Sequence, residues 1–229
     1  VVNRNVTDLG VILLTAGQGT RMKSSLPKVL HPLGGKPLFL HALGTAQRLE
    51  PKKVAVIIGH GAGAVRDAYD RNDVVWITQE KQLGTGHAVL CAKEAFSDFT
   101  GDILILSGDV PLIEEQTLAA MIKTHRESEA VLTLLTACLE TPTGYGRILR
   151  GGHGEITGSV EEKDATDAQK RIREVNAGIY VVAVRFLFAA LAAVKNDNRQ
   201  KEYYLPDIVA IGLAQGKKIA TVRVADPSE

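Results

Sequence analysis

Cysteine is scarce in this sequence, and its placement argues against two kinds of site. The chain has 229 residues but only 2 cysteines, Cys91 and Cys138, which lie in separate apolar segments. They form no Cys-x-x-Cys pair, and no histidine stands at metal-ligand spacing from them. We therefore expect neither a disulfide nor a zinc site. Because free cysteine behaves as a small apolar side chain, we predict that both are reduced and lie in the core.

An excess of charge of one sign is also missing. Lys and Arg number 27 and Asp and Glu number 26, which leaves a net charge of +1. Such a chain has no overall attraction to nucleic acid or to an anionic membrane, so an anionic ligand must be held by local groups. A content of 45% hydrophobic and 23% charged residues excludes a disordered chain and indicates a folded, soluble protein.

Long hydrophobic runs are absent as well. The longest, such as Phe186–Val194 and Val54–Ile58, are far shorter than the roughly 20 apolar residues that span a bilayer. The first residues, Val1–Asp8, lack the charged and apolar blocks of a signal peptide. These observations predict a cytoplasmic protein with no nucleic-acid partner and no membrane partner.

Short apolar, β-branched runs alternate with helical patterns along the chain. Strands are predicted at Val11–Leu14, Val54–Ile58, Val74–Ile77, Ile103–Leu106, Val131–Leu135, Ile179–Val184 and Ile219–Val224. Helices are predicted at Pro37–Leu49, Ala62–Tyr69, Thr85–Phe96, Glu114–Arg126, Arg185–Val194 and Pro206–Gln215. Near-continuous apolar strands between helices are typical of a doubly wound, mostly parallel α/β sheet, a Rossmann-like fold.

One stretch breaks this alternation. Thr141–Lys170 is polar, rich in glycine and weakly periodic, which predicts an inserted hairpin or small β lobe beside the sheet. No internal repeat or low-complexity segment is present in the sequence. We therefore predict one domain over residues 1–229, with an insertion at about 141–170.

The first predicted strand is followed by a loop suited to an anion. In doubly wound sheets, ligands bind at the carboxyl ends of the strands. Thr15, Ala16 and Gly17 come directly after the strand, and Arg21 and Lys28 follow. Glycine lets backbone N–H groups turn toward an anion, and the two cations supply positive charge around it. The loop therefore predicts a triphosphate site.

Three other interpretations of this loop can be weighed against that one. A dinucleotide-binding loop needs a third glycine where Met22 stands, and a Walker loop needs Ser or Thr where Pro37 follows Gly35-Lys36. Both requirements fail. A glycine turn without a ligand is the plain alternative, but it leaves the cations after a buried strand unexplained.

A lone carboxylate follows the fourth predicted strand. Ser107, Gly108 and Asp109 come directly after Ile103–Leu106. Mg²⁺ often takes one or two protein carboxylates and fills its other positions with water and phosphate oxygen, so Asp109 is a candidate metal ligand. Gly108 would let the backbone approach that ligand. The alternative is an Asp that caps the turn into the helix near Glu114.

A candidate base-reading loop follows the third predicted strand. Gln79 carries a donor and an acceptor in one planar amide, which can pair with a base edge. Exposed backbone at Gly84 and Thr85 would complete that contact. The alternative is a loop whose glycines cap a helix, and His87 is expected to be an ordinary helix residue rather than a catalyst.

Taken in order, these segments and further strings resemble the sugar-nucleotide pyrophosphorylases. The strings are Leu14–Met22, Leu26–Leu30, Gln82–Ala88, Gly108–Leu112, Pro142–Ile148, Glu161–Thr166, Asn176–Ile179 and Glu202–Ile208, and they cover nearly the whole chain. The first string marks the superfamily. Gln82–Ala88 and Gly144–Arg147 narrow the likeness to the N-terminal uridyltransferase half of the bifunctional GlmU family.

The resemblance implies an activity and a set of contacts. It implies that UTP and N-acetylglucosamine 1-phosphate give UDP-N-acetylglucosamine and pyrophosphate with Mg²⁺, for bacterial cell-wall synthesis. The residues implied to bind nucleotide are Leu14, Thr15, Ala16, Gly17, Gln79, Gly84, Thr85, Ser107 and Gly108. Arg21 and Lys28 are implied to hold phosphates, Asp109 the metal, and Gly146, Glu161, Asn176, Glu202 and Tyr204 the sugar or its surroundings.

Some positions depart from the family's pattern. Thr15, Gln18, Ser107 and Pro206 stand where the family usually has Ala, Lys, Tyr and Thr. We expect weaker affinity from these changes and the same type of reaction. The family's second metal ligand, an Asn, and its trimer-building acetyltransferase half both fall after Ser228-Glu229. We therefore expect this chain alone to be monomeric and a full-length protein to be a homotrimer.

The residues also predict how the reaction proceeds. No Ser–His–acid or Cys–His pairing is evident in the sequence, and in-line displacement at phosphorus needs none. Arg21 would neutralise the departing pyrophosphate, and Lys28 would steady the phosphoryl group. Two other functions stay open: a fragment that binds nucleotide with little turnover because the second metal ligand is missing, and a related cytidylyl- or guanylyltransferase.

Overall fold

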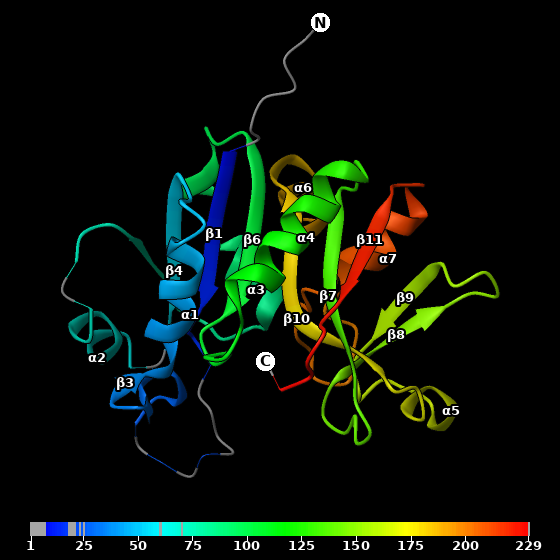
Figure 1. Cartoon of the computed structure of the whole chain (residues 1–229), viewed down its shortest axis with the longest axis horizontal. Helices are drawn as coiled ribbons and strands as arrows, with labels where there is room; N and C mark the ends of the chain where they lie inside the picture. The colour runs from blue at the N-terminus through cyan, green and yellow to red at the C-terminus, as the bar shows by residue number, and fades with distance from the viewer. Residues whose placement is uncertain are drawn as a thin grey trace, which may run out of the picture.

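A mixed β-sheet forms the centre of the structure (Figure 1). This computed structural model describes residues 8–17, 22, 24, 26–59, 61–69 and 71–228. Within them, seven strands lie in the order β11-β7-β10-β6-β1-β4-β5, and two more, β8 and β9, attach through β10. The seven are β1 (Asp8–Leu14), β4 (Lys53–Ile58), β5 (Val75–Thr78), β6 (Gly101–Ser107), β7 (Leu132–Cys138), β10 (Glu174–Ala183) and β11 (Ile219–Arg223).

One strand of the seven runs against the others. β1, β4, β5 and β6 pair in parallel, as do β7 and β11, whereas β10 is antiparallel to both of its neighbours, β6 and β7. The sheet is therefore mostly parallel, as the sequence predicts. Because β10 is reversed, its first residues lie at the edge where the parallel strands end.

Helices cover both faces of the sheet. Figure 1 shows α1 (Leu38–Gln47) and α4 (Glu115–Glu127) in front of it, and α6 (Val184–Leu191) and α7 (Asp207–Ala214) behind it. α2 (Ala62–Asp67) contributes Val65 to the same core cluster as α1, and α3 (Thr85–Leu90) joins the cluster of α6 and α7.

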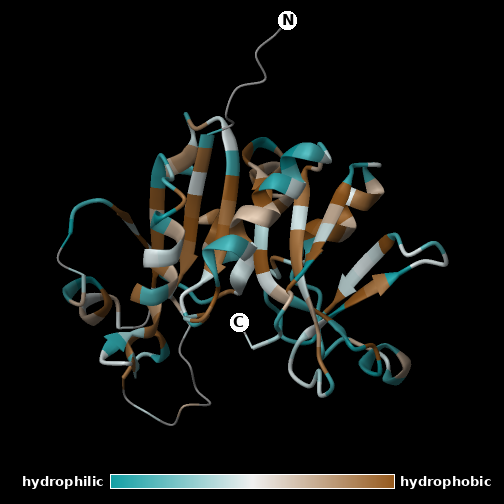
Figure 2. Cartoon of the chain, viewed as in Figure 1, coloured by the Kyte–Doolittle hydropathy of each residue, from teal (hydrophilic) through white to brown (hydrophobic). Residues whose placement is uncertain are grey.

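The two-sided cover explains why the strands are apolar throughout. On β1, Val11 and Leu13 face one helical layer and Ile12 faces the other, and all three are fully buried. Figure 2 shows the central strands as mostly hydrophobic, with a few paler positions between the hydrophobic ones. A strand with one wet face would alternate instead, so the sequence pattern and the layered fold have one cause.

A smaller hairpin projects from one end of the sheet. β8 (Gly146–Arg150) and β9 (Ile156–Val160) form it, and α5 (Asp167–Lys170) follows. β8 pairs with the start of β10 through Gly146 and Asn176. The predicted insertion over 141–170 therefore contains a hairpin, and it is joined to the sheet by hydrogen bonds rather than only lying beside it.

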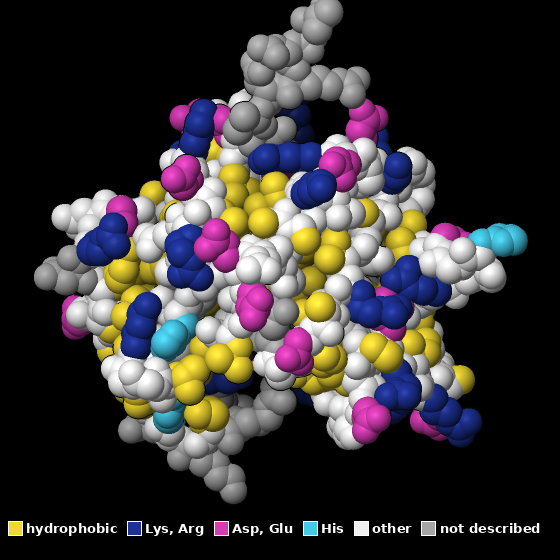
Figure 3. Space-filling model, viewed as in Figure 1, with side chains coloured by type: hydrophobic (Ala, Val, Ile, Leu, Met, Phe, Trp, Pro, Cys, Tyr) yellow, Lys and Arg dark blue, Asp and Glu magenta, His cyan; other side chains and the backbone are white. Residues whose placement is uncertain are grey.

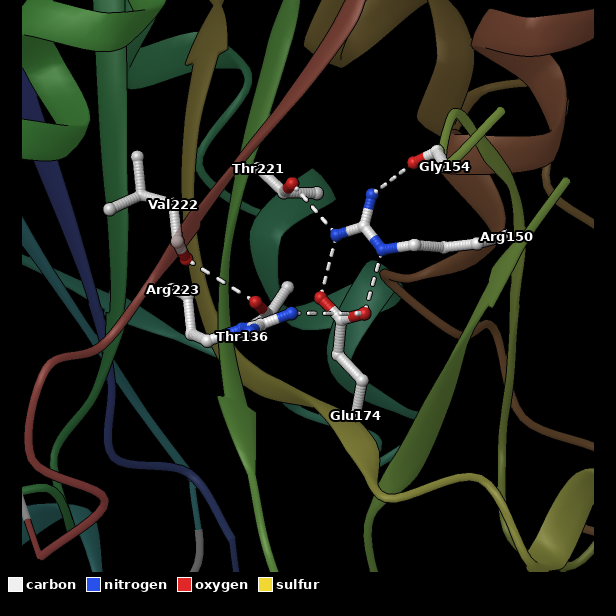
Figure 4. A network of polar contacts seen from close by, with 7 residues as sticks. All are labelled: Thr136, Arg150, Gly154, Glu174, Thr221, Val222 and Arg223. Atoms are coloured by element: carbon white, nitrogen blue, oxygen red, sulfur yellow. Dashed lines mark hydrogen bonds and ion pairs between the residues drawn. The ribbon is translucent and has the colours of Figure 1, made fainter. Parts of the chain in front are cut away.

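A polar network ties the hairpin to the main sheet (Figure 4). The Arg150 guanidinium donates twice to the Glu174 carboxylate, at 2.7 and 2.6 Å, and once to Thr221 on β11 at 3.0 Å. Arg223 lies 3.9 Å from the same carboxylate. Hydrogen bonds from Arg150 lower the pKa of Glu174, so the pair stays charged and orients the hairpin.

Most predicted elements are confirmed, with ends that differ by a few residues. The continuous helix predicted over Thr85–Phe96 is wrong. α3 ends at Leu90, and the next backbone bonds, from Ala92 to Val89 and from Lys93 to Leu90, span three residues instead of four. The chain therefore tightens into a separate 3₁₀ turn over Glu94–Phe96, which buries Phe96.

The cysteine prediction is only half correct. Both thiols are free, but Cys138 is exposed and Cys91 is half-buried, so neither is a core residue. Cys138 is the last residue of β7, where the strand leaves the cover of the helices. Sequence reasoning also missed the short strands β2 (Pro32–Leu33) and β3 (Lys36–Pro37).

The distribution of charged side chains on the surface agrees with the near-zero net charge. Figure 3 shows basic and acidic side chains interspersed on the face in view rather than gathered by sign. No helix in the described ranges is long and apolar enough to cross a bilayer.

Candidate functional site

The carboxyl edge of the sheet gathers residues that lie far apart in the sequence. β1 ends at Leu14 and β6 at Ser107, and these two residues are register partners. Asn176 comes near the start of the reversed strand β10, so it reaches the same edge. Two adjoining cavities open along this edge, and most of the predicted site residues line one or both of them.

The first cavity, which we call the loop cavity, has a volume of about 410 Å³. Its lining residues are Leu14, Ala16, Gly17, Gln79, Gln82, Gly84, Thr85, Ala88 and Glu202. Gly84 has φ +105°, and a Cβ at this position would lie 2.7 Å from the Tyr203 carbonyl oxygen. Glycine is therefore required where α3 begins, and it leaves backbone groups open to a ligand.

Gln79 is held in one orientation inside the loop cavity. Its side chain is almost fully buried, and its Nε2 donates to the Gly84 carbonyl at 3.2 Å and lies 3.0 Å from His87 Nδ1. Because an amide nitrogen only donates, both of its hydrogens are engaged, and the Oε1 acceptor is left for a ligand. A flipped amide would set two oxygens against each other, so Gly84 decides the orientation.

The second cavity, which we call the hairpin cavity, has a volume of about 540 Å³. Its lining residues are Leu14, Lys28, Thr85, Ser107, Asp109, Val110, Thr143, Gly144, Tyr145, Gly146, Glu161, Asn176, Ala177, Gly178, Tyr180, Leu205 and Pro206. It shares Leu14 and Thr85 with the loop cavity, so the two cavities adjoin.

Lys28 and Asp109 form an ion pair in the lining of the hairpin cavity. Lys28 Nζ donates to Asp109 Oδ2, and Ser107 Oγ donates to Oδ1. Burial by itself raises the pKa of Asp109, but the hydrogen bonds from Lys28 and Ser107 outweigh it, and the pKa is lowered. The carboxylate is therefore ionised, and at 26% exposure it remains open to the cavity.

Asp109 fits a magnesium ion better than a transition metal. In the part of the chain that the structure describes, no three His, Cys, Asp or Glu side chains are grouped as metal ligands. A single ionised carboxylate suits a cation that takes its remaining ligands from water and from a bound phosphate. Zinc would need three or four nitrogen or sulfur ligands.

Glu161 brings a second acidic group to the hairpin cavity. A Cβ on Gly146 would lie 3.1 Å from Glu161 Oε1, so glycine at 146 gives this carboxylate room. Burial, and then the charges of Asp207 and Asp164, raise the pKa of Glu161, while Arg147 lowers it. The carboxylate therefore accepts a proton more readily than an exposed Glu.

Asn176 is fixed by its own strand. Its Oδ1 accepts from the Gly178 backbone N–H at 3.0 Å, and its Nδ2 donates to the Tyr180 hydroxyl at 2.8 Å. Both Asn176 and Tyr180 line the hairpin cavity. One hydrogen of the Asn176 amide nitrogen is left for a ligand.

Three of the described site residues, Thr15, Gly108 and Tyr204, line neither cavity. Thr15 is buried, and its hydroxyl donates to the Ile57 carbonyl at 2.7 Å. Gly108 lies against Thr15, where a Cβ would meet Thr15 Cγ2 at 2.7 Å. Tyr204 is buried. Arg21 lies outside the described residues.

Two other residues line a different cavity from the one expected. Ser107, implied to bind nucleotide, lines the hairpin cavity and donates to Asp109. Glu202, implied to lie near the sugar, lines the loop cavity because the backbone N–H of Tyr203 donates to the Leu83 carbonyl at 2.8 Å.

Sequence reasoning missed the residues that hold the site in position. His87 secures the Gln79 amide and Tyr180 secures Asn176. Tyr180 reads as an ordinary core residue of an apolar strand, so no local pattern singles it out. His87 comes eight positions after Gln79, and only the turn between β5 and α3 brings the two together.

The sequence is similar to known proteins over most of its length. The family described as "MobA-like NTP transferase domain" matches residues 11–205. "Bifunctional protein GlmU" of Geotalea daltonii is 47% identical over 222 residues, which is 96% of this chain and 49% of that protein. The protein of the same name from Thermus thermophilus is 51% identical over 212 residues, or 93% of this chain and 46% of that protein. The chain spans about half the length of these relatives.

Solved structures share the fold at low identity. A UDP-glucose pyrophosphorylase complexed with UDP-glucose superimposes with a TM-score of 0.75 at 16% identity, covering 94% of this chain and 91% of that one. A putative glucose-1-phosphate thymidylyltransferase from Bacillus anthracis gives 0.79 at 15% identity, covering 95% and 87%. These likenesses show the nucleotidyltransferase architecture.

Proposed function

The chain belongs to the family of MobA-like NTP transferase domains, and on that premise we propose that it transfers a uridylyl group from UTP to N-acetylglucosamine 1-phosphate. The products are UDP-N-acetylglucosamine and pyrophosphate. The name of the relatives, together with the family match, supports this choice of substrates.

The observation that carries the proposal is the adjacency of the two cavities. Groups suited to a base line the loop cavity, and groups suited to a sugar and to phosphates line the hairpin cavity. Leu14 and Thr85 belong to both. Transfer between two bound substrates requires their reacting atoms to come together. Substrates bound in two cavities that share a wall would lie end to end, with those atoms close to each other.

The locked amide of Gln79 supports uracil as the base. Uracil offers an N3–H donor, whereas cytosine offers an N3 acceptor at the same place. The free Oε1 acceptor complements the N3–H of uracil, and it would face a like acceptor, N3, if cytosine bound in the same pose. Backbone groups at Gly84 and Thr85 reinforce the selection because they cannot exchange donor for acceptor.

The phosphates would lie along Lys28. Its ammonium is already directed at the hairpin cavity by Asp109, and it would hold the α-phosphoryl group or the incoming sugar phosphate. We propose that Arg21 neutralises the departing pyrophosphate. Asp109 would hold Mg²⁺, which when bound neutralises phosphate charge and aligns the phosphates.

The reaction needs no covalent intermediate. An oxygen of the sugar phosphate attacks the α-phosphorus of UTP, the bond to the β-phosphate breaks, and pyrophosphate leaves with the electron pair. The residues of this chain orient both substrates and supply positive charge where negative charge accumulates. Asn176 and Glu161 would hold the acetamido sugar so that its phosphate points toward Lys28.

The test is the release of pyrophosphate from UTP and N-acetylglucosamine 1-phosphate with and without Mg²⁺. Parallel reactions replace UTP by CTP or GTP, and the sugar by glucose 1-phosphate. We expect turnover only with UTP and Mg²⁺, with preference for the acetamido sugar. Equal rates with CTP would contradict the uridylyl assignment. Binding of UTP without turnover in any mixture would instead support a nucleotide-binding fragment.

A further inference from the structure

Strand β10 contains a distortion next to the side chains of the hairpin cavity that we propose to bind the sugar. Asn176 pairs with Thr136 on β7, and Tyr180 pairs with Leu134. Four steps along β10 therefore match two steps along β7, so β10 carries two extra residues. Gly178 lies in this bulge with φ +76°, a conformation that other residues rarely adopt.

The bulge produces a contact that a regular strand cannot make. Residues four apart on a regular strand are separated by roughly 13 Å at 3.3 Å per residue. Here the Asn176 amide nitrogen lies 2.8 Å from the Tyr180 hydroxyl oxygen. Two extra residues and a positive φ thus fold the strand until these two side chains meet at the wall of the cavity.

Two contacts hold the Asn176 amide: the Gly178 N–H selects its orientation, and the Tyr180 hydroxyl anchors its nitrogen. Gly178 N–H donates to Oδ1, and the Tyr180 oxygen accepts from Nδ2. A flipped amide would set its N–H₂ group against the Gly178 N–H, so one orientation is selected. Tyr180 and Asn176 are 2% and 6% exposed, which leaves little room for either to rearrange.

Tyr180 keeps its proton under ordinary conditions. Burial raises the pKa of Tyr180 far above its usual value, the Asn176 hydrogen bond lowers it, and the charges of Glu161 and Asp207 raise it further. A neutral hydroxyl can accept from Asn176 throughout the working pH range. A phenolate would add a negative charge beside Glu161, in the same cavity.

We propose that Tyr180 is a positioning residue for the sugar substrate, which acts by holding the Asn176 amide ready for the acetamido group. This inference rests on the proposed function, because the acetamido sugar is the ligand assigned to Asn176. An amide that is already oriented loses less freedom when the sugar binds, so affinity rises without a new contact to the ligand. A sugar without an acetamido group would gain little from it.

The experiment replaces Tyr180 with phenylalanine, which keeps the buried ring and removes only the hydroxyl. The matched control is Tyr69→Phe. Tyr69 also accepts a hydrogen bond from an amide, Gln47 Nε2 at 2.9 Å, and neither residue lines the two cavities. The measurements are KM and kcat for N-acetylglucosamine 1-phosphate, glucose 1-phosphate and UTP, with the melting temperature of each variant.

For Tyr180→Phe we expect KM for N-acetylglucosamine 1-phosphate to rise by about 3- to 10-fold, the effect of losing one hydrogen bond in a buried site. The KM for UTP and for glucose 1-phosphate should stay within about 2-fold of wild type, as should kcat. Tyr69→Phe should change none of these constants. An equal rise for all three substrates, or no rise for the acetamido sugar, would overturn the inference.

A double-mutant cycle separates positioning from a structural role. In the Asn176→Ala background there is no amide to orient, so adding Tyr180→Phe should change KM for the acetamido sugar by less than about 2-fold. A further loss of the same size as in the wild-type background would mean that Tyr180 does not act through Asn176, and would overturn the proposal.

Calorimetric titration with N-acetylglucosamine 1-phosphate alone distinguishes this inference from the proposed function. If wild type binds the sugar phosphate, Tyr180→Phe weakens that binding, and no mixture with UTP turns over, then the proposed function fails and the positioning role stands. If wild type turns over and both variants bind the sugar phosphate equally, the positioning role fails and the function stands. No binding to wild type overturns both.

Discussion

The loop cavity and the hairpin cavity adjoin, yet different kinds of chemical group line them. The loop cavity lies at the ends of parallel strands, and small residues and two hydrogen-bonded amides, Gln79 and Gln82, make up much of its lining. The hairpin cavity carries the side chains of Lys28, Asp109, Glu161 and Asn176, which come from separate segments of the chain. Recognition of a ligand therefore depends on backbone shape in the loop cavity, and on charges and hydrogen bonds in the hairpin cavity.

This difference has a consequence for substitution. A backbone N–H or C=O survives a change of side chain, so the loop cavity should tolerate most substitutions other than those at glycines and Gln79. The hairpin cavity should not, because its polar side chains depend on particular partners, and some of these come from distant segments. Lys28 and Asp109, for example, are 81 positions apart.

The largest expected effect is that of Asp109→Asn in the hairpin cavity. The amide is nearly isosteric but lacks the charge that Mg²⁺ and Lys28 need, so turnover should fall by at least about 100-fold. The melting temperature should stay close to that of wild type. Steady-state rates measure turnover, thermal melting measures stability, and a Mn²⁺ titration followed by electron paramagnetic resonance measures metal binding. Asp98→Asn, which alters an exposed carboxylate, is the control.

If Asp109→Asn kept more than a few per cent of the rate, or bound Mn²⁺ as wild type does, Asp109 would not be the metal ligand. Charge would then matter less in the hairpin cavity than the contrast with the loop cavity predicts.

In the loop cavity, Gln79→Ala is the one side-chain change that should matter strongly. It removes the oriented acceptor, and we expect UTP binding to weaken by about 1–3 kcal/mol while the advantage over CTP narrows. Calorimetric titration with UTP and CTP in one buffer tests this. Gln215→Ala, at an exposed helix end, is the control. An equal loss for both nucleotides would show that backbone alone reads the base.

Glu161→Gln should affect only the sugar side. The neutral amide keeps the shape but accepts weaker hydrogen bonds, so KM for N-acetylglucosamine 1-phosphate should rise by about 10-fold and KM for UTP should not change. Because burial and neighbouring acids raise the pKa of Glu161, the difference between wild type and variant should shrink as the pH falls. Glu155→Gln on the same hairpin is the control; a pH-independent difference would contradict this assignment.

The smallest expected effect concerns stability. Burial, and then the charges of Asp164 and Asp197, raise the pKa of Asp207 to about 6. The folded chain therefore holds this proton more tightly than the unfolded chain, and that stabilisation is complete at low pH and is lost as the pH rises through about 6. Asp207→Asn cannot ionise, so it should be more stable than wild type above pH 6 and equal to it near pH 4.

Because Asp207 is only partly buried, solvent screening limits the gain. We expect the melting temperature of Asp207→Asn at pH 7.5 to exceed that of wild type by about 2–4 °C, the shift produced by about 1 kcal/mol in a chain of this length. Thermal melting at pH 4, 6 and 7.5 is the measurement. A variant less stable than wild type at pH 7.5 would show that the Asp207 carboxylate is held by favourable contacts instead.

Sequence reasoning located the loop cavity better than the hairpin cavity. Ala16, Gly17, Gln79 and Gly84 follow apolar strands directly, and the rule that ligands collect at carboxyl ends of parallel strands places them together. The position of Asn176 depends on β10 being antiparallel, which no local pattern reports. The role of Thr15 also could not be predicted, because its hydroxyl is used by Ile57 on the neighbouring strand.

The sequence by itself determined the layered α/β fold and the glycine loop, because periodicity and glycine act over a few residues and can be read locally. It also identified Asp109 as a lone carboxylate after a buried strand. Only the tertiary structure decided that Lys28 pairs with Asp109, that His87 secures Gln79, and that a bulge brings Tyr180 to Asn176. These contacts depend on strand order, direction and register, which are set by the packing of the whole sheet.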